Sequence, residues 1–338
     1  MEVCSIGQDV AILYSMSKQQ LYLIESFEVR DIRHKERVDV YLHRHFPETT
    51  RTSFQKQIGK NYIYINGKFA DKAFKLKAGD RVEIFSPFKS KTGWQANKQI
   101  VPDIVYEDDE VIVVNKPAGL QVHPATGNYN NTLVNGLVAY LSEKEQRPFL
   151  VHRLDKFTEG LMVFAKTKSV QENLSDQFKK GLAGRKYKAL VWGKLNNDGT
   201  INQPIGRDKK EGNTFRVFTG DEKGGKNAVT HYRVIKAFAF HSWVECELET
   251  GRTHQIRVHF QSIGNPLVGD FEYGGNKLLF GIRDEAYYYK MERLLGLFNG
   301  QALLAYKLEF ILPSNNKNSE FKLDLPPDFC SAIDLLQN

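Results

Sequence analysis

The sequence is poor in cysteine and contains no long hydrophobic run. Only three cysteines occur in 338 residues, Cys4, Cys246 and Cys330, and none forms a Cys-x-x-Cys pair. Such isolated cysteines argue against a disulfide framework or a thiolate zinc site, so we expect a reducing, cytoplasmic location. No segment approaches the ~20 apolar residues of a membrane helix, and the first residues do not resemble a secretion signal. We therefore expect no membrane partner.

Several common catalytic signatures are also missing. The chain has no Walker phosphate loop, no Gly-x-Gly-x-x-Gly after a strand, no Gly-x-Ser-x-Gly elbow and no His-Glu-x-x-His. Nucleotide-driven, dinucleotide-dependent, serine-hydrolase and zinc-protease functions lose their usual support. The composition, 41% hydrophobic and 26% charged, is that of a globular chain rather than a disordered one. At about 150 residues per domain, the length predicts roughly two domains.

Positive charge is concentrated in one short segment. The formal net charge is +7, from 47 Lys+Arg and 40 Asp+Glu. Residues 30–89 contain 14 basic and 7 acidic side chains, which leaves 33 of each sign for the rest of the chain. A local basic excess is typical of a module that binds a polyanion such as RNA, although a solvated lysine-rich surface would give the same count.

The basic segment has its own pattern of short elements. Apolar residues at helical spacing predict two short helices, one starting near Val38 and one containing Phe54, with the loop 47–50 between them. Next comes a strand over 62–65 and then Asn66-Gly67, a strong hairpin signal because both central turn positions need positive φ. A further strand is expected over 81–85. We assign residues 1–27 to an N-terminal extension, 28–89 to this module and 90–100 to a linker.

The order helix, helix, hairpin, strand in about 60 basic residues resembles the S4-like RNA-binding domain. The segment Arg51-Thr52-Ser53 at the start of the second helix and the hairpin Ile65-Asn66-Gly67-Lys68 carry this resemblance. In that family the second helix and the loop after it face RNA. The resemblance therefore implies that phosphate groups contact four basic side chains: Arg51, Lys56, Lys60 and Lys68.

Residues 101–338 alternate between strand-like and helix-like segments. Buried strands are expected over 111–115 and 161–165, with further strands over 187–193, 229–235 and 243–249. Helices are expected over 133–141, 169–180 and 253–261. Strands and helices mixed in this way, with several hairpins, predict the α+β class, with a mixed, largely antiparallel sheet. A small α/β S4-like module precedes this domain.

Two polar clusters lie next to predicted strands. His152–Gly160 precedes a buried strand, where a loop can hold a carboxylate in fixed geometry. Taken alone, the cluster fits a structural ion pair with a turn glycine better. The second cluster is Gly251–His259. Its two histidines, His254 and His259, are five residues apart, so they do not share a helix face and make a poor metal pair. We expect each to be hydrogen-bonded, and we predict no metal site.

Taken together, the clusters resemble the successive motifs of the RluA-type pseudouridine synthases. The resemblance covers residues 101–330 and follows the order of motifs in that family. The matching segments are Val105–Asp108, Val113–Gly119, Val122–Pro124, His152–Gly160, Arg185–Val191, Gly251–His259, Gly264–Asp270 and Tyr273-Gly274. An S4-like module ahead of the catalytic domain is a known arrangement in this family.

The resemblance implies a catalytic set of Asp155, Tyr187 and Arg257. Asp155 matches the family's catalytic aspartate, Tyr187 the aromatic residue that stacks on the target base, and Arg257 the basic partner of the aspartate. These residue types suit the reaction. An ionised carboxylate can act as nucleophile or base, a guanidinium fixes its orientation, and an aromatic face holds a base without blocking its rotation. The phenol of Tyr187 could also help to remove the C5 proton.

Three further residues are implied to contact RNA. Arg153 matches the side chain that fills the gap when the uridine leaves the helix, and Arg252 and His254 lie in the third motif. The target atom is unreachable inside a stacked helix, so the nucleotide must flip out at a cost of a few kcal/mol. The isomerisation involves no redox change and neither consumes nor releases water, so no cofactor is expected.

The chain departs from the family pattern at several positions. Glu159 replaces the usual Ser and adds a negative charge where a phosphate contact is expected. Ala302–Ala305 and Phe310–Pro313 lack the histidines common there. Residues 276–299 have no assignment, and we expect their aromatic residues, Tyr287–Tyr289, to be core residues more often than base-stacking ones.

The sequence thus predicts a monomeric, cytoplasmic RNA pseudouridine synthase. Large-subunit ribosomal RNA is the first choice of target and transfer RNA the second. One rival is a non-catalytic RNA-binding or ribosome-assembly factor on the same fold. Another is a carboxylate-based glycoside hydrolase, which needs a second acid, and Glu159 is the nearest candidate in sequence. Whether Asp155 attacks C1′, attacks C6 or acts as a base is left open.

Overall fold

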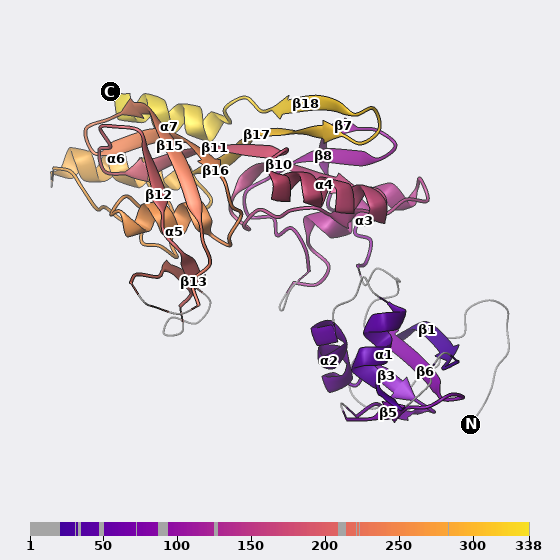
Figure 1. The fold of residues 1–338 in the computed structure, drawn as a ribbon. Coiled ribbons are helices and arrows are strands. Elements are labelled where there is room, and N and C mark those ends of the chain that lie inside the picture. Colours follow the sequence, from indigo (N-terminus) through magenta and orange to yellow (C-terminus); the bar gives the residue numbers. More distant parts are fainter. Residues whose placement is uncertain are drawn as a thin grey trace. The chain divides into compact units, whose positions relative to one another are not determined.

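The structure, a computed structural model, describes residues 21–30, 32, 35–46, 51–71, 73–86, 94–124, 128–208, 214–220, 222, 224–282 and 284–337. The chain divides into two compact units, Met1–Gln95 and Ala96–Asn338. Figure 1 shows the elements of both units.

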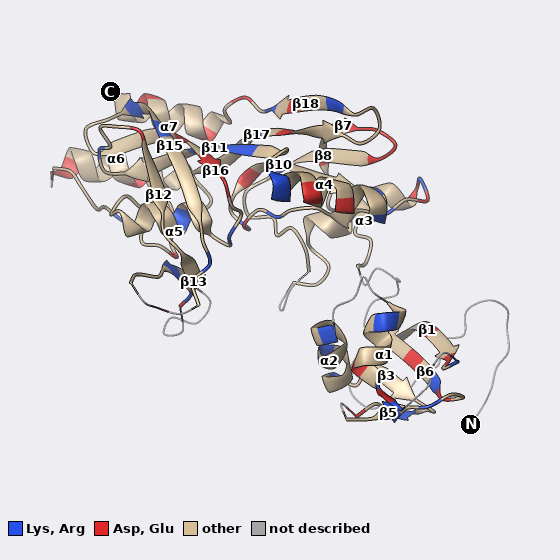
Figure 2. Ribbon diagram, viewed as in Figure 1, with Lys and Arg blue, Asp and Glu red and all other residues tan. Residues whose placement is uncertain are grey.

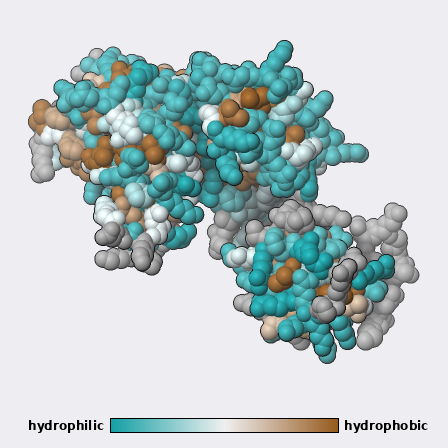
Figure 3. Space-filling model, viewed as in Figure 1, coloured by the Kyte–Doolittle hydropathy of each residue, from teal (hydrophilic) through white to brown (hydrophobic). Residues whose placement is uncertain are grey.

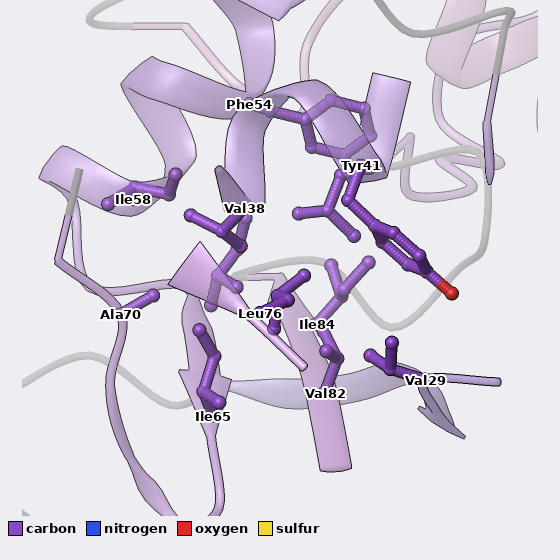
Figure 4. Close-up of a cluster of buried hydrophobic side chains, with 12 residues drawn as sticks. Val29, Val38, Tyr41, Phe54, Ile58, Ile65, Ala70, Leu76, Val82 and Ile84 are labelled. Atoms are coloured by element: carbon purple, nitrogen blue, oxygen red, sulfur yellow. The ribbon is translucent and has the colours of Figure 1, made fainter. Parts of the chain in front are cut away.

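The small unit is a four-stranded antiparallel sheet packed against two helices. Its strand order is β1-β6-β3-β4, and β2 pairs with β5 separately. Apolar side chains of both helices pack on the sheet, and Val38, Phe54, Ile58 and Val82 meet in this core (Figure 4). The elements are β1 Tyr22–Glu28, β2 Glu36–Arg37, α1 Val38–His45, α2 Arg51–Gly59, β3 Ile63–Ile65, β4 Lys68–Phe69, β5 Lys75–Leu76 and β6 Arg81–Ser86.

The two predicted helices and the hairpin are confirmed. Asn66 and Gly67 have φ of 52° and 76°, as a tight turn between β3 and β4 requires. The loop 47–50 lies outside the described residues. The N-terminal boundary of the small unit differs from our assignment, because β1 lies mostly within the assigned extension but pairs with β6 along its length. Residues 22–28 are therefore part of the small sheet.

The large unit is built on one ten-stranded sheet. Its order is β12-β15-β16-β11-β17-β10-β8-β7, with β18 beside β17 and β9 beside β10. The pair of β10 and β17 is parallel, and the other pairs described in this sheet are antiparallel. The mixed, largely antiparallel sheet of an α+β fold is thus confirmed. Its strands are β7 Asp103–Glu107, β8 Val111–Lys116, β9 Phe149–Leu150, β10 Glu159–Ala165, β11 Gly184–Trp192, β12 Gly199–Asn202, β15 Val229–Ala237, β16 His241–Leu248, β17 Leu303–Leu312 and β18 Lys317–Lys322.

Helices cover the sheet through two separate apolar clusters. One cluster packs α4 on β8, β10 and β17, and the other packs α6 and α7 on β11, β16 and β17. A two-stranded hairpin, β13 Ile205–Arg207 with β14 Phe215–Val217, contacts α5. No helix in the described residues is long and apolar enough to cross a membrane. The helices are α3 Leu133–Ser142, α4 Lys168–Lys180, α5 Gln255–Ser262, α6 Glu285–Gly296 and α7 Pro327–Gln337.

Strand register brings distant motifs together. Leu304 of β17 pairs with Glu159 of β10 on one side and with Lys188 of β11 on the other. The loop that precedes β10 therefore ends level with the first half of β11. Gly160 permits this close pairing, because its φ is +115° and a Cβ would lie 2.3 Å from the carbonyl oxygen of Ala305.

Two segments differ from our expectations. The predicted linker ends earlier, because Asn97 donates its backbone N–H to Asn135 in α3 and residues 97–100 pack on this helix. The unassigned segment 276–299 contains α6. Tyr287 of α6 packs in the apolar cluster, but Tyr288 and Tyr289 are 49% and 64% exposed, so their expected core role is wrong. In Figure 3, hydrophobic residues gather at the left of the large unit, where Figure 1 labels α6.

Candidate active site

Asp155 lies in a loop that a buried lysine holds in place. Lys116, at the end of β8, has no exposed surface and donates to the carbonyl oxygens of Pro117, Leu120 and Lys156 at 2.8–2.9 Å. One ammonium group thus joins the loop after β8 to the residue next to Asp155. Burial lowers the pKa of Lys116 to about 7, against the charges of Asp155 and Glu159.

A cavity of about 350 Å³ opens beside this loop. The His152–Thr158 loop, the first half of β11 and the turn that leads into α5 line most of it. It brings together every residue that the sequence placed in the catalytic domain's site. These residues are Arg153, Asp155, Tyr187, Arg252, His254 and Arg257.

Arg257 is the electrostatic centre of the cavity. It is almost fully buried, and its Nη1 lies 3.4 Å from Oδ2 of Asp155. Its Nε and Nη2 hold both carboxylate oxygens of Asp270 at 2.7 and 2.8 Å, and Nη2 also contacts Glu272 at 2.5 Å. Burial alone would lower the pKa of Arg257, but these carboxylates raise it above its ordinary value. The guanidinium is therefore permanently charged and held by a bidentate pair.

His254 takes a strained position at the start of α5. Its φ is +56°, a left-handed conformation that is uncommon outside glycine. The ring Nδ1 lies 2.8 Å from the hydroxyl of Tyr273, and Nε2 lies 3.9 Å from Asp155. Burial lowers the pKa of His254 despite the nearby carboxylate of Asp155. His259 is also hydrogen-bonded, to Thr230 and to the carbonyl of Gln203, as we predicted.

Tyr187 presents a buried ring to the cavity. The side chain is only 4% exposed, and burial raises the pKa of its phenol although the charge of Arg185 opposes this shift. Its hydroxyl is therefore protonated at neutral pH. A neutral, fixed aromatic ring beside a carboxylate is suited to hold a planar base.

The other four predicted RNA contacts belong to the small unit. Arg51 and Lys56 lie on α2, where Figure 2 shows basic residues, Lys60 follows the helix and Lys68 begins β4. All four are exposed. Arg51 differs from the lysines, because its Nε lies 2.8 Å from Oδ2 of the buried Asp39.

Comparisons with known proteins identify the families of both units. Residues 110–262 match the family model described as RNA pseudouridylate synthase, and residues 36–82 match the S4 domain. The chain is 40% identical over 308 residues to an uncharacterized RNA pseudouridine synthase of Bacillus subtilis, covering 89% of this chain and 94% of that protein. It is 38% identical over 303 residues to the ribosomal large subunit pseudouridine synthase D of Neisseria meningitidis, covering 89% and 79%.

The chain belongs to the RluA-type RNA pseudouridine synthases. Its fold also matches a solved human structure, RNA pseudouridylate synthase domain containing 4, with a TM-score of 0.57 at 24% identity over 70% of this chain and 93% of that one. The large unit of this synthase is thus the isomerase, and the S4 domain of the small unit makes RNA its partner.

Glu159 is a half-buried acid at the start of β10. Burial and the charge of Asp328 raise the pKa of Glu159 to about 7, against the pull of Lys116. An acid whose pKa is raised on folding stabilises the protein less as pH increases from its ordinary value of 4.5 to about 7.

We predict that Glu159→Gln stabilises the synthase at pH 8 by about 1–2 kcal/mol, allowing for partial solvent screening, with little gain near pH 4.5. Urea unfolding of both proteins across this pH range measures the difference. An equal gain at both pH values would contradict the assigned ionisation.

Asp39 organises the S4 domain around one buried carboxylate. Its side chain has no exposed surface and accepts hydrogen bonds from Arg37, Arg51 and Gln55 at 2.7–3.3 Å. These bonds outweigh burial and lower the pKa of Asp39 well below its ordinary value. The stabilisation is therefore present above the ordinary aspartate pKa and lost as pH falls below it.

We predict that Asp39→Asn destabilises the S4 domain by about 1–3 kcal/mol, because the buried acceptor loses its charge while its donors stay in place. Hydrogen exchange of the α1 and α2 amides in the full chain measures this change. Asp71→Asn, at an exposed position of the same domain, is the matched control and should change exchange little. Equal protection in both variants would contradict the prediction.

Sequence reasoning missed four residues that complete the site. Asp270, Glu272 and Tyr273 lie in or beside a recognised motif, and Lys116 ends a predicted strand, but none was given a role. A lysine at the end of an otherwise apolar strand was the available signal for Lys116. Nothing local indicates that Asp270 meets Arg257, because the loop after α5 must fold back first. Within the described residues, no group of His, Cys, Asp and Glu side chains could hold a metal ion.

Proposed function

We propose that this synthase converts specific uridines of large-subunit ribosomal RNA to pseudouridine. The observation that carries the proposal is one cavity in which Arg257 contacts Asp155 beside the buried ring of Tyr187. The relatives from Neisseria and Salmonella are named as ribosomal large subunit pseudouridine synthases, which supports this choice of RNA.

The reaction breaks one bond and forms another at the same sugar carbon. The N1–C1′ glycosidic bond of uridine breaks, the uracil rotates in place, and C5 joins C1′. C5 loses its proton and N1 gains one, so atoms and electrons balance without an oxidant or an added water. The protein must therefore hold the detached base and move one proton.

Each residue has a role that follows from its position. Asp155 acts as the nucleophile or base, and Arg257 orients its carboxylate. Tyr187 supports the base through its ring during rotation. Arg153, exposed at the cavity, fills the space that the flipped nucleotide leaves in the RNA. Arg252 and His254, which also line the cavity, contact the RNA.

The S4 domain captures the RNA, and the large unit selects the base. The net positive charge of the chain lies in residues 30–89, and phosphate contacts bind RNA without sequence preference. Lys56, Lys60 and Lys68 are exposed for such contacts, while the large unit carries nearly balanced charge. The enzyme acts in the cytoplasm and is a monomer. Light scattering of the purified protein measures its molecular mass and so tests the monomeric state.

The decisive experiment maps pseudouridines in RNA from cells with and without this gene. Loss of defined sites in large-subunit ribosomal RNA, restored by the purified protein on unmodified RNA, is the expected result. Lost sites in transfer RNA alone would overturn the choice of substrate. Binding without turnover would indicate a non-catalytic assembly factor, and release of free uracil would indicate a hydrolase.

A further inference from the structure

Two adjacent cations on β11 face opposite sides of the sheet. Side chains alternate along a strand, so Arg185 shares the cavity face with Tyr187, and both line the cavity. Lys186 faces the other side, where its Nζ lies 3.0 Å from Glu247 of β16. The strand thus turns one basic residue toward an acidic partner and the other toward the site.

Arg185 is held at a defined place in the cavity wall. Its guanidinium lies 4.8 Å from the ring centroid of Phe178 in α4, a cation–π contact. Phe178 in turn packs against the ring of His152 at 5.2 Å. On the opposite side, a Cβ at Gly251 would lie 3.1 Å from Nη2 of Arg185. The guanidinium therefore sits between α4 and the turn before α5, where glycine leaves room for it.

The carboxylates beside the cavity contact Arg257 rather than Arg185 in the described part of the chain. Arg257 forms ion pairs with three carboxylates, those of Asp155, Asp270 and Glu272. Among the residues that the structure describes, Arg185 forms no ion pair. A guanidinium that packs on an aromatic ring and forms no ion pair with a carboxylate can donate its N–H groups to an anionic ligand.

We propose that Arg185 binds a phosphate next to the target uridine and so holds the flipped nucleotide on Tyr187. Arg185 and Tyr187 are two residues apart, about 7 Å along the strand, which suits one nucleotide lying across both. Phosphate contacts fix the register of a nucleic acid on a protein. This inference rests on the proposed function and adds a phosphate site to its cavity.

Steady-state kinetics of the full-length protein test the site. The substrate is a stem-loop RNA that carries the mapped uridine, and the variants are Arg185→Gln and the matched control Lys186→Gln. Loss of a charge-assisted hydrogen bond should raise KM about tenfold to a hundredfold in Arg185→Gln and leave kcat within about threefold. Lys186→Gln should change neither constant. Equal behaviour of the two variants, or a fall in kcat at unchanged KM, would overturn the inference.

Neutral phosphates identify the contacted group. A methylphosphonate placed on one side of the target uridine should weaken RNA binding by wild-type protein and weaken binding by Arg185→Gln no further. If neither position weakens wild-type binding, or if the loss is the same in both proteins, Arg185 does not bind that phosphate. Arg185→Lys keeps the charge but loses the planar guanidinium, so its RNA affinity should lie between those of wild type and Arg185→Gln. This variant also tests the site if Arg185→Gln is too unstable to measure.

The same measurements separate this inference from the proposed function. Filter binding of the RNA reads the phosphate contact even without turnover. If wild-type protein forms no pseudouridine, the proposed function fails, whereas the binding series still decides the role of Arg185. If wild-type protein is active and Arg185→Gln matches Lys186→Gln, only this inference fails.

Discussion

Asp155→Asn should reduce pseudouridine formation by at least about 10⁴-fold, the scale on which loss of a catalytic carboxylate or its equivalent is felt. An amide cannot supply the negative charge that attack or proton removal needs. The side chain keeps its shape, and Lys116 still holds the neighbouring backbone, so RNA affinity should change little. Quantifying pseudouridine by mass spectrometry after incubation with unmodified ribosomal RNA measures the effect.

Asp109→Asn is the matched control for that substitution. Asp109 is exposed in the turn between β7 and β8, and its replacement removes the same charge far along the chain from Asp155. It should keep wild-type activity. If Asp155→Asn is as active as Asp109→Asn, Asp155 is not the catalytic carboxylate.

Arg257→Gln should damage both stability and activity. The substitution leaves Asp155, Asp270 and Glu272 without the cation they share, and Asp270 has no exposed surface. Removing one partner of a buried ion pair costs about 3–5 kcal/mol, because the remaining charge is neither solvated nor paired. Urea unfolding reports the loss of stability, and turnover of ribosomal RNA should fall below detection.

Two further variants interpret the Arg257 result. Arg257→Lys keeps the charge but cannot hold both oxygens of Asp270, so its stability should lie between Arg257→Gln and wild type. Arg293→Gln removes an exposed guanidinium on α6 and should unfold like wild type. If Arg257→Gln unfolds at the same urea concentration as Arg293→Gln, the three carboxylates do not depend on Arg257.

Local pattern was sufficient to predict elements whose residues contact their neighbours in sequence. Asn66-Gly67 is a strong turn signal by itself, and the short apolar run before Pro117 favours the buried strand that β8 forms. The residues that line the cavity could be selected from the sequence because family motifs lie around each of them. These features need no knowledge of distant contacts.

What the sequence could not predict depends on contacts between distant segments. Residues 22–28 include a short apolar run, but only pairing with β6 makes them part of the small unit. Arg51 looks like any surface arginine until α1 brings Asp39 beside it. Tyr288 and Tyr289 belong to the aromatic run Tyr287–Tyr289, yet both are exposed on α6. For residues 22–28 and for Arg51, a partner outside the local segment decides the environment.

The single ammonium of Lys116 has a consequence for how this protein opens. Because it holds the loop after β8 and the backbone beside Asp155 together, neither loop can unfold locally without releasing the other. Both should therefore exchange their amide hydrogens as one cooperative segment. The same amine is inaccessible to acylating reagents while the segment is closed. The rate at which Lys116 is acylated, compared with the rate at exposed lysines, would therefore measure how often the candidate active site opens.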